Sequence, residues 1–348
     1  MQTHMQSSKA LRAAFIVLAG IIIGIGFIKG HYSSSGPGFS SSTKHAVAHM
    51  PKLKTDDIIY HHMHNTVPIV SEEYKIVFFQ VAKAASSEWV RFFMRLGCNP
   101  DWCSANTQMH DPEQNGLTYL SDFSLEEANH MMTSDEWTRA IFVRNPKPRI
   151  LSAFLDKSVE HAKHWKNQTC PVYAYALGEN DGTHMQHTED EAYCKHHHNS
   201  FEFFLYNITT IIKDNVHWRS IYSRIDEKWW PKINFIGHMN NISDDAESLL
   251  RSINSTKDGV SAWERMGKTG WGENELNCSA IGTHSFLGKR ENHHETDARD
   301  KMAQYYTPEL ERFVESHYAD DFNNRFYHFD GVTLFEEEGE DKTIEDLF

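Results

Sequence analysis

Several features of common functional classes are missing from this 348-residue sequence. Its five cysteines include no C-x-x-C pair, so a zinc ribbon is not indicated. The formal net charge is −14, and a chain this acidic is unsuited to binding nucleic acid over a broad surface. The phosphate-loop pattern G-x-x-x-x-G-K-[ST] is absent, which argues against a nucleoside triphosphatase. A polyanionic ligand would therefore need a local cluster of basic side chains.

The odd number of cysteines permits two disulfides and one free thiol. Cys98 with Cys103 and Cys170 with Cys194 are candidate pairs, although connectivity cannot be read from a sequence. A histidine-rich stretch around the second pair raises the question of a metal site, but its spacing fits no standard one. The residues concerned are His184, His187, Cys194, His196, His197 and His198. We therefore expect no functional metal.

An apolar run, Ala13–Ile28, lies near the N-terminus and is flanked by Lys9, Arg12 and Lys29. It is short for a hydrocarbon core about 30 Å thick and suits a thin membrane of the early secretory pathway. Positive charge before the run predicts a cytosolic N-terminus and a single-pass type II anchor, with the rest of the chain lumenal. A cleaved signal peptide is the alternative, although no clear A-x-A site follows.

Five N-x-[ST] sequons support a lumenal position, because such sequons are the acceptors of N-linked glycans. They begin at Asn167, Asn207, Asn241, Asn254 and Asn277.

The pattern along the chain predicts five parts. A Ser/Gly-rich stretch without apolar periodicity predicts a flexible stem, and the acidic C-terminal end predicts a solvated, disordered tail. The parts are residues 1–8 (cytosolic tail), 9–29 (transmembrane anchor), 30–70 (stem), 71–330 (globular domain) and 331–348 (acidic tail).

Three short apolar runs in the globular part predict buried strands at 75–81, 139–144 and 232–236. Each run is followed by apolar residues at helical spacing. A final helix is predicted from Thr307 as cap and a proline at its first position, ending at about Tyr318. This alternation predicts an α/β fold with a parallel sheet flanked by helices on both faces. Ligands of such sheets bind beyond the carboxyl ends of the strands.

The first of these strands runs into a turn of small residues. The turn and the start of the next helix contain Lys83, Ala84, Ala85, Ser86 and Ser87. Small side chains let backbone N–H groups approach an anion, and the helix N-terminus adds partial positive charge. Lys83 adds a full charge and Ser87 a hydroxyl. The segment is either a phosphate-binding loop without the usual glycines or an ordinary turn.

The second strand ends at Arg144, and two prolines then give the chain a fixed path. Arg149 and Ser152 follow one helical turn apart. A guanidinium and a hydroxyl that converge beyond a strand end suit a phosphate monoester. Arg149 could equally be an ordinary ion-pairing residue.

Together and in this order, the two motifs resemble those of the Golgi carbohydrate sulfotransferases of the chondroitin/dermatan and HNK-1 type. The first segment reads AKAASSEW and matches at Lys83, Ser87 and Trp89, but not at that family's proline and cysteine. The second reads FVRNPKPRILSAF and matches closely. Downstream, SFEFFLYN, DNVHW, INFIGHMNNISDDAESLL and the closing YADDF are also similar, so the resemblance covers roughly Tyr74 to Tyr327. The family's cysteine pair after the HW segment is missing, which leaves the acceptor in doubt.

The resemblance implies a P-loop-like sulfotransferase fold and a Golgi membrane location. It implies PAPS (3′-phosphoadenosine 5′-phosphosulfate) as donor and a carbohydrate hydroxyl as acceptor. Lys83 and residues 84–87 would bind the 5′-phosphosulfate, and Arg144, Arg149 and Ser152 the 3′-phosphate.

The acceptor hydroxyl needs a base that works near neutral pH, for which histidine is apt. His110, between the two motifs, and His217, in the HW segment, are the candidates, and Glu88 is a third. Two other functions stay open. One is a lumenal glycan-binding protein without turnover, which the intact motif residues disfavour. The other is a nucleotide kinase-like enzyme, which the missing glycines disfavour.

Overall fold

The computed structural model describes residues 50–60, 67–102, 109–160, 199–210, 215–271, 286, 296–329 and 333–335. All of them belong to the second of the chain's two compact units, His49–Phe348. The predicted anchor, the sequons at Asn167 and Asn277 and the histidine-rich stretch lie outside the described residues. Among the described helices, none is long and apolar enough to cross a membrane.

A five-stranded sheet in the order β3-β1-β2-β4-β5 forms the centre of this unit. Its strands are β1 (Ile69–Ser71), β2 (Ile76–Phe79), β3 (Thr118–Tyr119), β4 (Thr138–Val143) and β5 (Phe235–His238). Strands β2, β4 and β5 are parallel, as expected. The sheet is mixed, however, because β1 pairs antiparallel with both β2 and β3. Only a short turn joins β1 to β2, and a connection that short can link strands only in antiparallel fashion.

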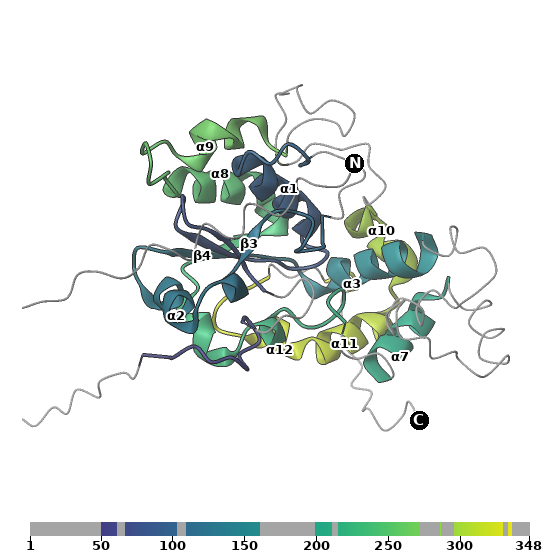
Figure 1. Cartoon of the computed structure of the whole chain (residues 1–348). Helices are drawn as coiled ribbons and strands as arrows, with labels where there is room; N and C mark the ends of the chain where they lie inside the picture. The colour runs from purple at the N-terminus through teal and green to yellow at the C-terminus, as the bar shows by residue number, and fades with distance from the viewer. Residues whose placement is uncertain are drawn as a thin grey trace, which may run out of the picture. The chain divides into compact units, whose positions relative to one another are not determined.

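Helices pack on both sides of the sheet. Figure 1 shows α1, α8 and α9 over one face and α2 with α12 toward the other, while α3, α7, α10 and α11 lie together beyond the sheet. The α-helices are α1 (Ser86–Leu96), α2 (Leu125–Thr133), α3 (Pro146–Phe154), α7 (Phe201–Thr210), α8 (Ile242–Ser252), α9 (Ala262–Arg265), α10 (Ala298–Tyr305), α11 (Pro308–His317) and α12 (Ala319–Asn323). A π-helical turn, η2 (Leu155–Glu160), continues α3. The 3-10 turns are η1 (Leu120–Asp122), η3 (Tyr222–Arg224), η4 (Glu227–Lys232), η5 (Met239–Asn241) and η6 (Gly267–Thr269).

Most predicted elements are present, with two differences of position. The third strand is β5 and begins at Phe235, because residues 227–232 form η4, which buries Trp229 and Trp230. Helix α11 begins as predicted, with the Thr307 side chain accepting a hydrogen bond from the N–H of Leu310. It is followed by the short helix α12 instead of being the last one.

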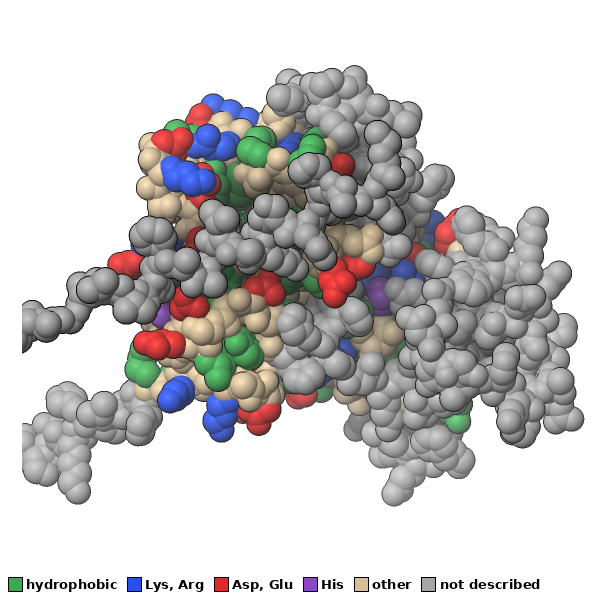
Figure 2. Space-filling model, in the orientation of Figure 1, with side chains coloured by type: hydrophobic (Ala, Val, Ile, Leu, Met, Phe, Trp, Pro, Cys, Tyr) green, Lys and Arg blue, Asp and Glu red, His purple; other side chains and the backbone are tan. Residues whose placement is uncertain are grey.

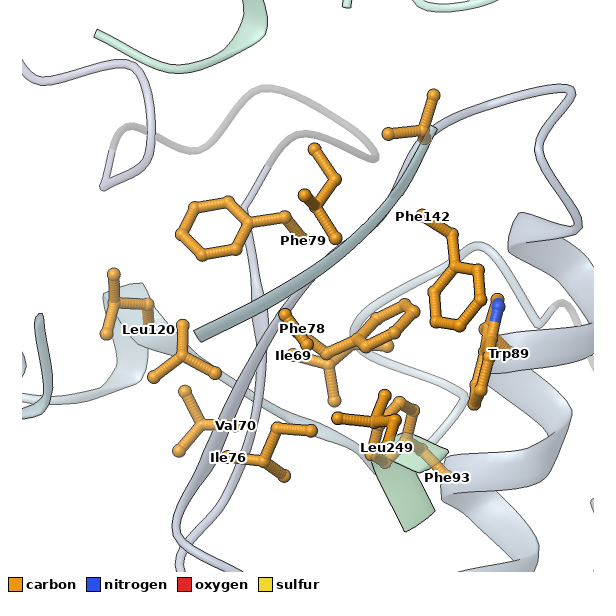
Figure 3. Packing of buried hydrophobic residues seen from close by; sticks show 14 of the residues in the cluster. Ile69, Val70, Ile76, Phe78, Phe79, Trp89, Phe93, Leu120, Phe142 and Leu249 are labelled. Atoms are coloured by element: carbon orange, nitrogen blue, oxygen red, sulfur yellow. The ribbon is translucent and has the colours of Figure 1, made fainter. Parts of the chain in front are cut away.

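The hydrophobic core contains two clusters. One joins the sheet to the helices on its faces, and Figure 3 shows Phe78, Trp89 and Phe142 packed together within it. The Trp89 ring lies 4.8 Å from that of Phe78 and 4.7 Å from that of Phe142, between centroids. The other cluster joins α3, α7, α10 and α11. Trp89, which follows the phosphate-binding motif, therefore anchors α1 on the sheet and fixes where that helix begins.

Packing extends into parts of the chain that the sequence assigns to the stem and the tail. Leu53 and Ile59 are buried in the sheet cluster, and Leu334 and Phe335 pack against the helical one. Cys98 is an exposed free thiol, whereas Cys103, Cys170 and Cys194 of the candidate disulfide pairs lie outside the described residues. Cys98 directly follows Gly97, the C-cap of α1, in the left-handed region at φ 57°.

Candidate active site

The loop between β2 and α1 lies at the carboxyl end of the parallel strands. The N–H of Ala84 donates to the carbonyl of Val81 over 3.0 Å, which closes a tight turn. Lys83 and Ala85 adopt positive φ angles of 65° and 59°, although neither is glycine. Such conformations cost energy and cluster at functional sites. Ala85, the N-cap of α1, provides no side-chain hydrogen bond to the first turn. The N–H groups of that turn therefore point toward the position where an anion would bind.

Two arginines of the second motif hold this loop by its backbone. A terminal nitrogen of Arg144 donates to the carbonyl of Lys83 over 2.8 Å, and Arg149 Nε donates to that of Ala82 over 3.1 Å. Burial lowers the pKa of Arg144 to about 10, so it stays charged at neutral pH. Arg149 is fully buried. Both guanidinium groups thus position the loop between β2 and α1.

Buried arginine side chains also contact the backbone of the HW segment. Arg149 and Arg224 both donate to the carbonyl of Val216, over 3.5 and 2.9 Å, and Arg224 also donates to the carbonyl of Gln80. Ser152 is buried, and its hydroxyl accepts a hydrogen bond from Thr296 Oγ1 at 2.9 Å. These hydrogen bonds hold the loop after β2, the second motif and the HW segment next to one another.

An ion-pair cluster that sequence reasoning missed surrounds the Lys83 side chain. Asp156 Oδ2 lies 2.9 Å from Lys83 Nζ and 3.2 Å from Lys157 Nζ, and all three side chains are at least nine-tenths buried. Burial lowers the pKa of Lys83 to about 8, although the charge of Asp156 raises it. Asp156 and Lys157 lie in η2, one turn beyond Ser152. The available signal was the spacing of Asp156, which lies four residues after that motif serine and therefore on the same helix face.

His217 faces this cluster from the HW segment. Its Nδ1 lies 2.8 Å from Asn215 Oδ1, which assigns the ring proton to Nδ1 and leaves Nε2 as the acceptor. Burial lowers the pKa of His217 well below 6.5, and the charges of Lys157 and Lys83 lower it further. The imidazole is therefore neutral at physiological pH. A neutral, oriented imidazole is suited to accept a proton.

His110 contacts the first turn of α1, which follows the same loop. Its Nε2 lies 2.9 Å from Ser87 Oγ, and its ring is exposed. Asn115, fully buried, donates to the carbonyl of Met109 and so holds the turn that carries His110. The charge of His110 also acts on His217. The structure thus brings both predicted histidines to one site, with His217 half-buried and His110 exposed. Glu88 points elsewhere, 3.8 Å from Arg91 on its own helix.

The closing YADDF motif supports this site from α12. Asp321 is fully buried and accepts hydrogen bonds from the N–H groups of Ile221 and Tyr222 and from the hydroxyls of Ser220 and Tyr327. The Tyr318 hydroxyl donates to the carbonyl of Trp218, next to His217, over 2.6 Å. The motif therefore fixes the segment that presents His217.

We expect Asp321→Ala to lower the free energy of unfolding by about 2–4 kcal/mol, because buried donors lose their acceptor. Chemical denaturation measures this change. Asp320→Ala is the matched control, since that neighbouring carboxylate is exposed, and it should change stability by less than about 0.5 kcal/mol. Equal effects of the two substitutions would contradict the anchoring role of Asp321.

Positive charge exceeds negative charge at the site. Lys83, Lys157, Arg144 and Arg149 gather around Asp156 at the carboxyl edge of the sheet. On the face in Figure 2, in contrast, acidic and basic side chains of the described residues are interspersed. The excess charge is thus local, and it suits a ligand with several negative charges. Among the described residues, no group of His, Cys, Asp and Glu could hold a metal.

Such an anion-binding centre at the carboxyl edge of an α/β sheet is typical of enzymes that act on phosphorylated ligands. The sequence profile that describes the sulfotransferase family matches residues 68–330, well over half of the chain. The chain therefore belongs to the sulfotransferase family.

Curated relatives agree with this assignment. Carbohydrate sulfotransferase 9 of Homo sapiens is 26% identical over 204 residues, which are 57% of this chain and 43% of that protein. Carbohydrate sulfotransferase 10 of Xenopus laevis is 27% identical over 193 residues, which are 52% and 51% of the two chains. The chain thus spans about half the length of the curated relatives it matches. No solved structure matches it significantly.

Proposed function

We propose that this protein transfers a sulfuryl group from PAPS to a hydroxyl of a carbohydrate in the Golgi lumen, anchored by residues 9–29 as a type II membrane protein. The observation that carries the proposal is the left-handed loop at Lys83, which leads into a helix N-terminus beside the buried cations. The resemblance to carbohydrate sulfotransferases supports the choice of acceptor.

PAPS supplies the sulfuryl group in an activated phosphosulfate. Residues 84–87 would hold its 5′-phosphate through backbone N–H groups and the Ser87 hydroxyl. Lys83 would neutralise the charge that develops on the leaving phosphate, a kind of electrostatic stabilisation that contributes strongly to catalysis. Arg144, which is half-buried and charged, would serve the 3′-phosphate in addition to holding the loop. Arg149 and Ser152 are buried and would act mainly by fixing this geometry.

His217 would take the proton of the acceptor hydroxyl at Nε2. Asn215 keeps the ring in the required tautomer, and burial keeps it neutral. His110 would stay beside Ser87 and orient the acceptor from the exposed side.

The lumenal location makes a prediction for the sequons. Asn241 and Asn254 are exposed, whereas Asn207 is buried and donates to the carbonyl of Phe203 over 2.7 Å. After expression in the secretory pathway, Asn241→Gln and Asn254→Gln should each remove one endoglycosidase-sensitive mass step on a gel, and Asn207→Gln none. A chain without any glycan would argue against the lumenal assignment, whereas loss of a step in Asn207→Gln would contradict the buried position of Asn207.

The experiment that tests the function is incubation of the purified chain with radiolabelled PAPS and a panel of desulfated glycans. Label incorporated into a glycan, and none with ATP as donor, is the expected result. Binding of PAPS or PAP without transfer to any glycan would favour a glycan-binding protein that lacks turnover. Phosphoryl transfer from ATP would favour a kinase-like enzyme.

A further inference from the structure

The Lys83–Asp156–Lys157 cluster is not explained by ordinary folding requirements. Burying three charged side chains is costly, and apolar residues of similar size would commonly be at least as stable. The cluster lies where the left-handed loop meets η2, beside His217. Its members are the lysine proposed to act on the donor, one carboxylate and a second lysine. The arrangement therefore suggests that the cluster controls the position and the charge of the Lys83 ammonium.

We propose that Asp156 is a positioning residue of the donor site: its carboxylate holds the Lys83 ammonium in a buried ion pair, and Lys157 competes for the same carboxylate. This inference rests on the proposed function. Asp156 Oδ2 contacts Lys83 Nζ at 2.9 Å and Lys157 Nζ at 3.2 Å, so one anion is shared by two buried cations. Substitution of Asp156 or of Lys157 should therefore alter how strongly the cluster stabilises the charged form of Lys83.

The charged groups around Lys83 come from three elements. Asp156 and Lys157 lie in η2, Arg144 follows β4, and His217 lies in the HW segment. Asp156 raises the pKa of Lys83, whereas Lys157, Arg144 and, above all, burial lower it, to about 8. His217 is neutral and Arg144 is charged between pH 7 and 9, so neither titrates in that interval.

PAP is what remains of the donor after transfer, and its binding affinity reports the protonation of Lys83 without any turnover. PAP binds the charged form of Lys83, so its affinity is fully present at low pH and falls as pH rises through the pKa of Lys83 in the free enzyme. Wild-type affinity, measured by calorimetry from pH 4.5 to 10, should therefore fall with a midpoint near pH 8. Asp156→Asn should move this midpoint down by about 1–3 pH units, because an opposite charge in contact is lost. Lys157→Gln should move it up.

Three further variants make the test specific. Asp156→Glu keeps the charge and should restore the wild-type midpoint. Glu136→Gln makes the same change in the exposed ion pair with Lys75, at the other end of β2, and should leave the midpoint unchanged. If Asp156→Asn does not fold, the upward shift in Lys157→Gln still decides the question.

A midpoint that moves in the same direction in Asp156→Asn and Lys157→Gln, or in neither, would overturn the inference. Equal shifts in Asp156→Asn and Asp156→Glu would overturn it too, since charge would then not be the cause. If PAP binds neither the wild type nor any variant, the proposed function fails instead. The two failures are therefore distinguishable.

Discussion

Lys83→Ala is expected to lower kcat for sulfuryl transfer by about 10²–10³-fold while the domain stays folded. The reason is that Lys83 belongs to the loop that leads into α1, and a positioned donor to a developing negative charge contributes about 3–4 kcal/mol in related chemistry. Asp156 keeps Lys157 as a partner, so the substitution leaves no isolated buried charge. Transfer of labelled sulfate to a glycan measures kcat, and circular dichroism checks the fold.

Lys75→Ala is the matched control for this experiment. Lys75 lies just before β2, whereas Lys83 follows the other end of that strand. The Lys75 side chain is 39% exposed and forms an ion pair with Glu136. Surface ion pairs contribute little to stability, so both fold and turnover should persist. Turnover near the wild-type rate in Lys83→Ala would contradict the assignment of the phosphate-binding loop.

His217→Gln is expected to lower kcat by about 10²–10⁴-fold with little change in PAP affinity, because it removes a proton acceptor and not a donor contact. Glutamine keeps a similar volume and polarity in a buried position. His110→Gln is the comparison: it should affect KM for the glycan more than kcat, since His110 is exposed and bonded to Ser87. Loss of kcat in His110→Gln, with normal kcat in His217→Gln, would assign the base to His110.

The pH dependence of kcat tests the same assignment in the wild type. A general base works in its neutral form, so activity is lost as pH falls through its pKa in the folded enzyme. The pKa of His217 lies well below 6.5, so the rate should stay constant from pH 7 to below 6.5 and decline only at more acidic pH. This acid limb should be absent from the residual rate of His217→Gln. A decline centred at about 6.5, the value of an unperturbed imidazole, would argue against His217.

Much of the fold could be predicted from local patterns. The apolar runs located β2 and β4, and the change from small residues to helical periodicity located the start of α1. Strands β1 and β3 were missed because they are two or three residues long, too short for a periodic signal. The start of β5 was placed three residues too early, at Lys232, because Ile233 extends the apolar run and hydrophobicity alone does not show where strand pairing begins.

The sequence by itself determined the family of this protein and the two loops that meet at the site, because turn residues, helix starts and strand ends depend on neighbours along the chain. Only the tertiary structure decided what the charged residues do. It directed Arg144 and Arg149 at backbone carbonyls, paired Lys83 with Asp156, and left His217 half-buried and His110 exposed. Burial and ion pairing set protonation, and they depend on residues brought together from distant parts of the chain.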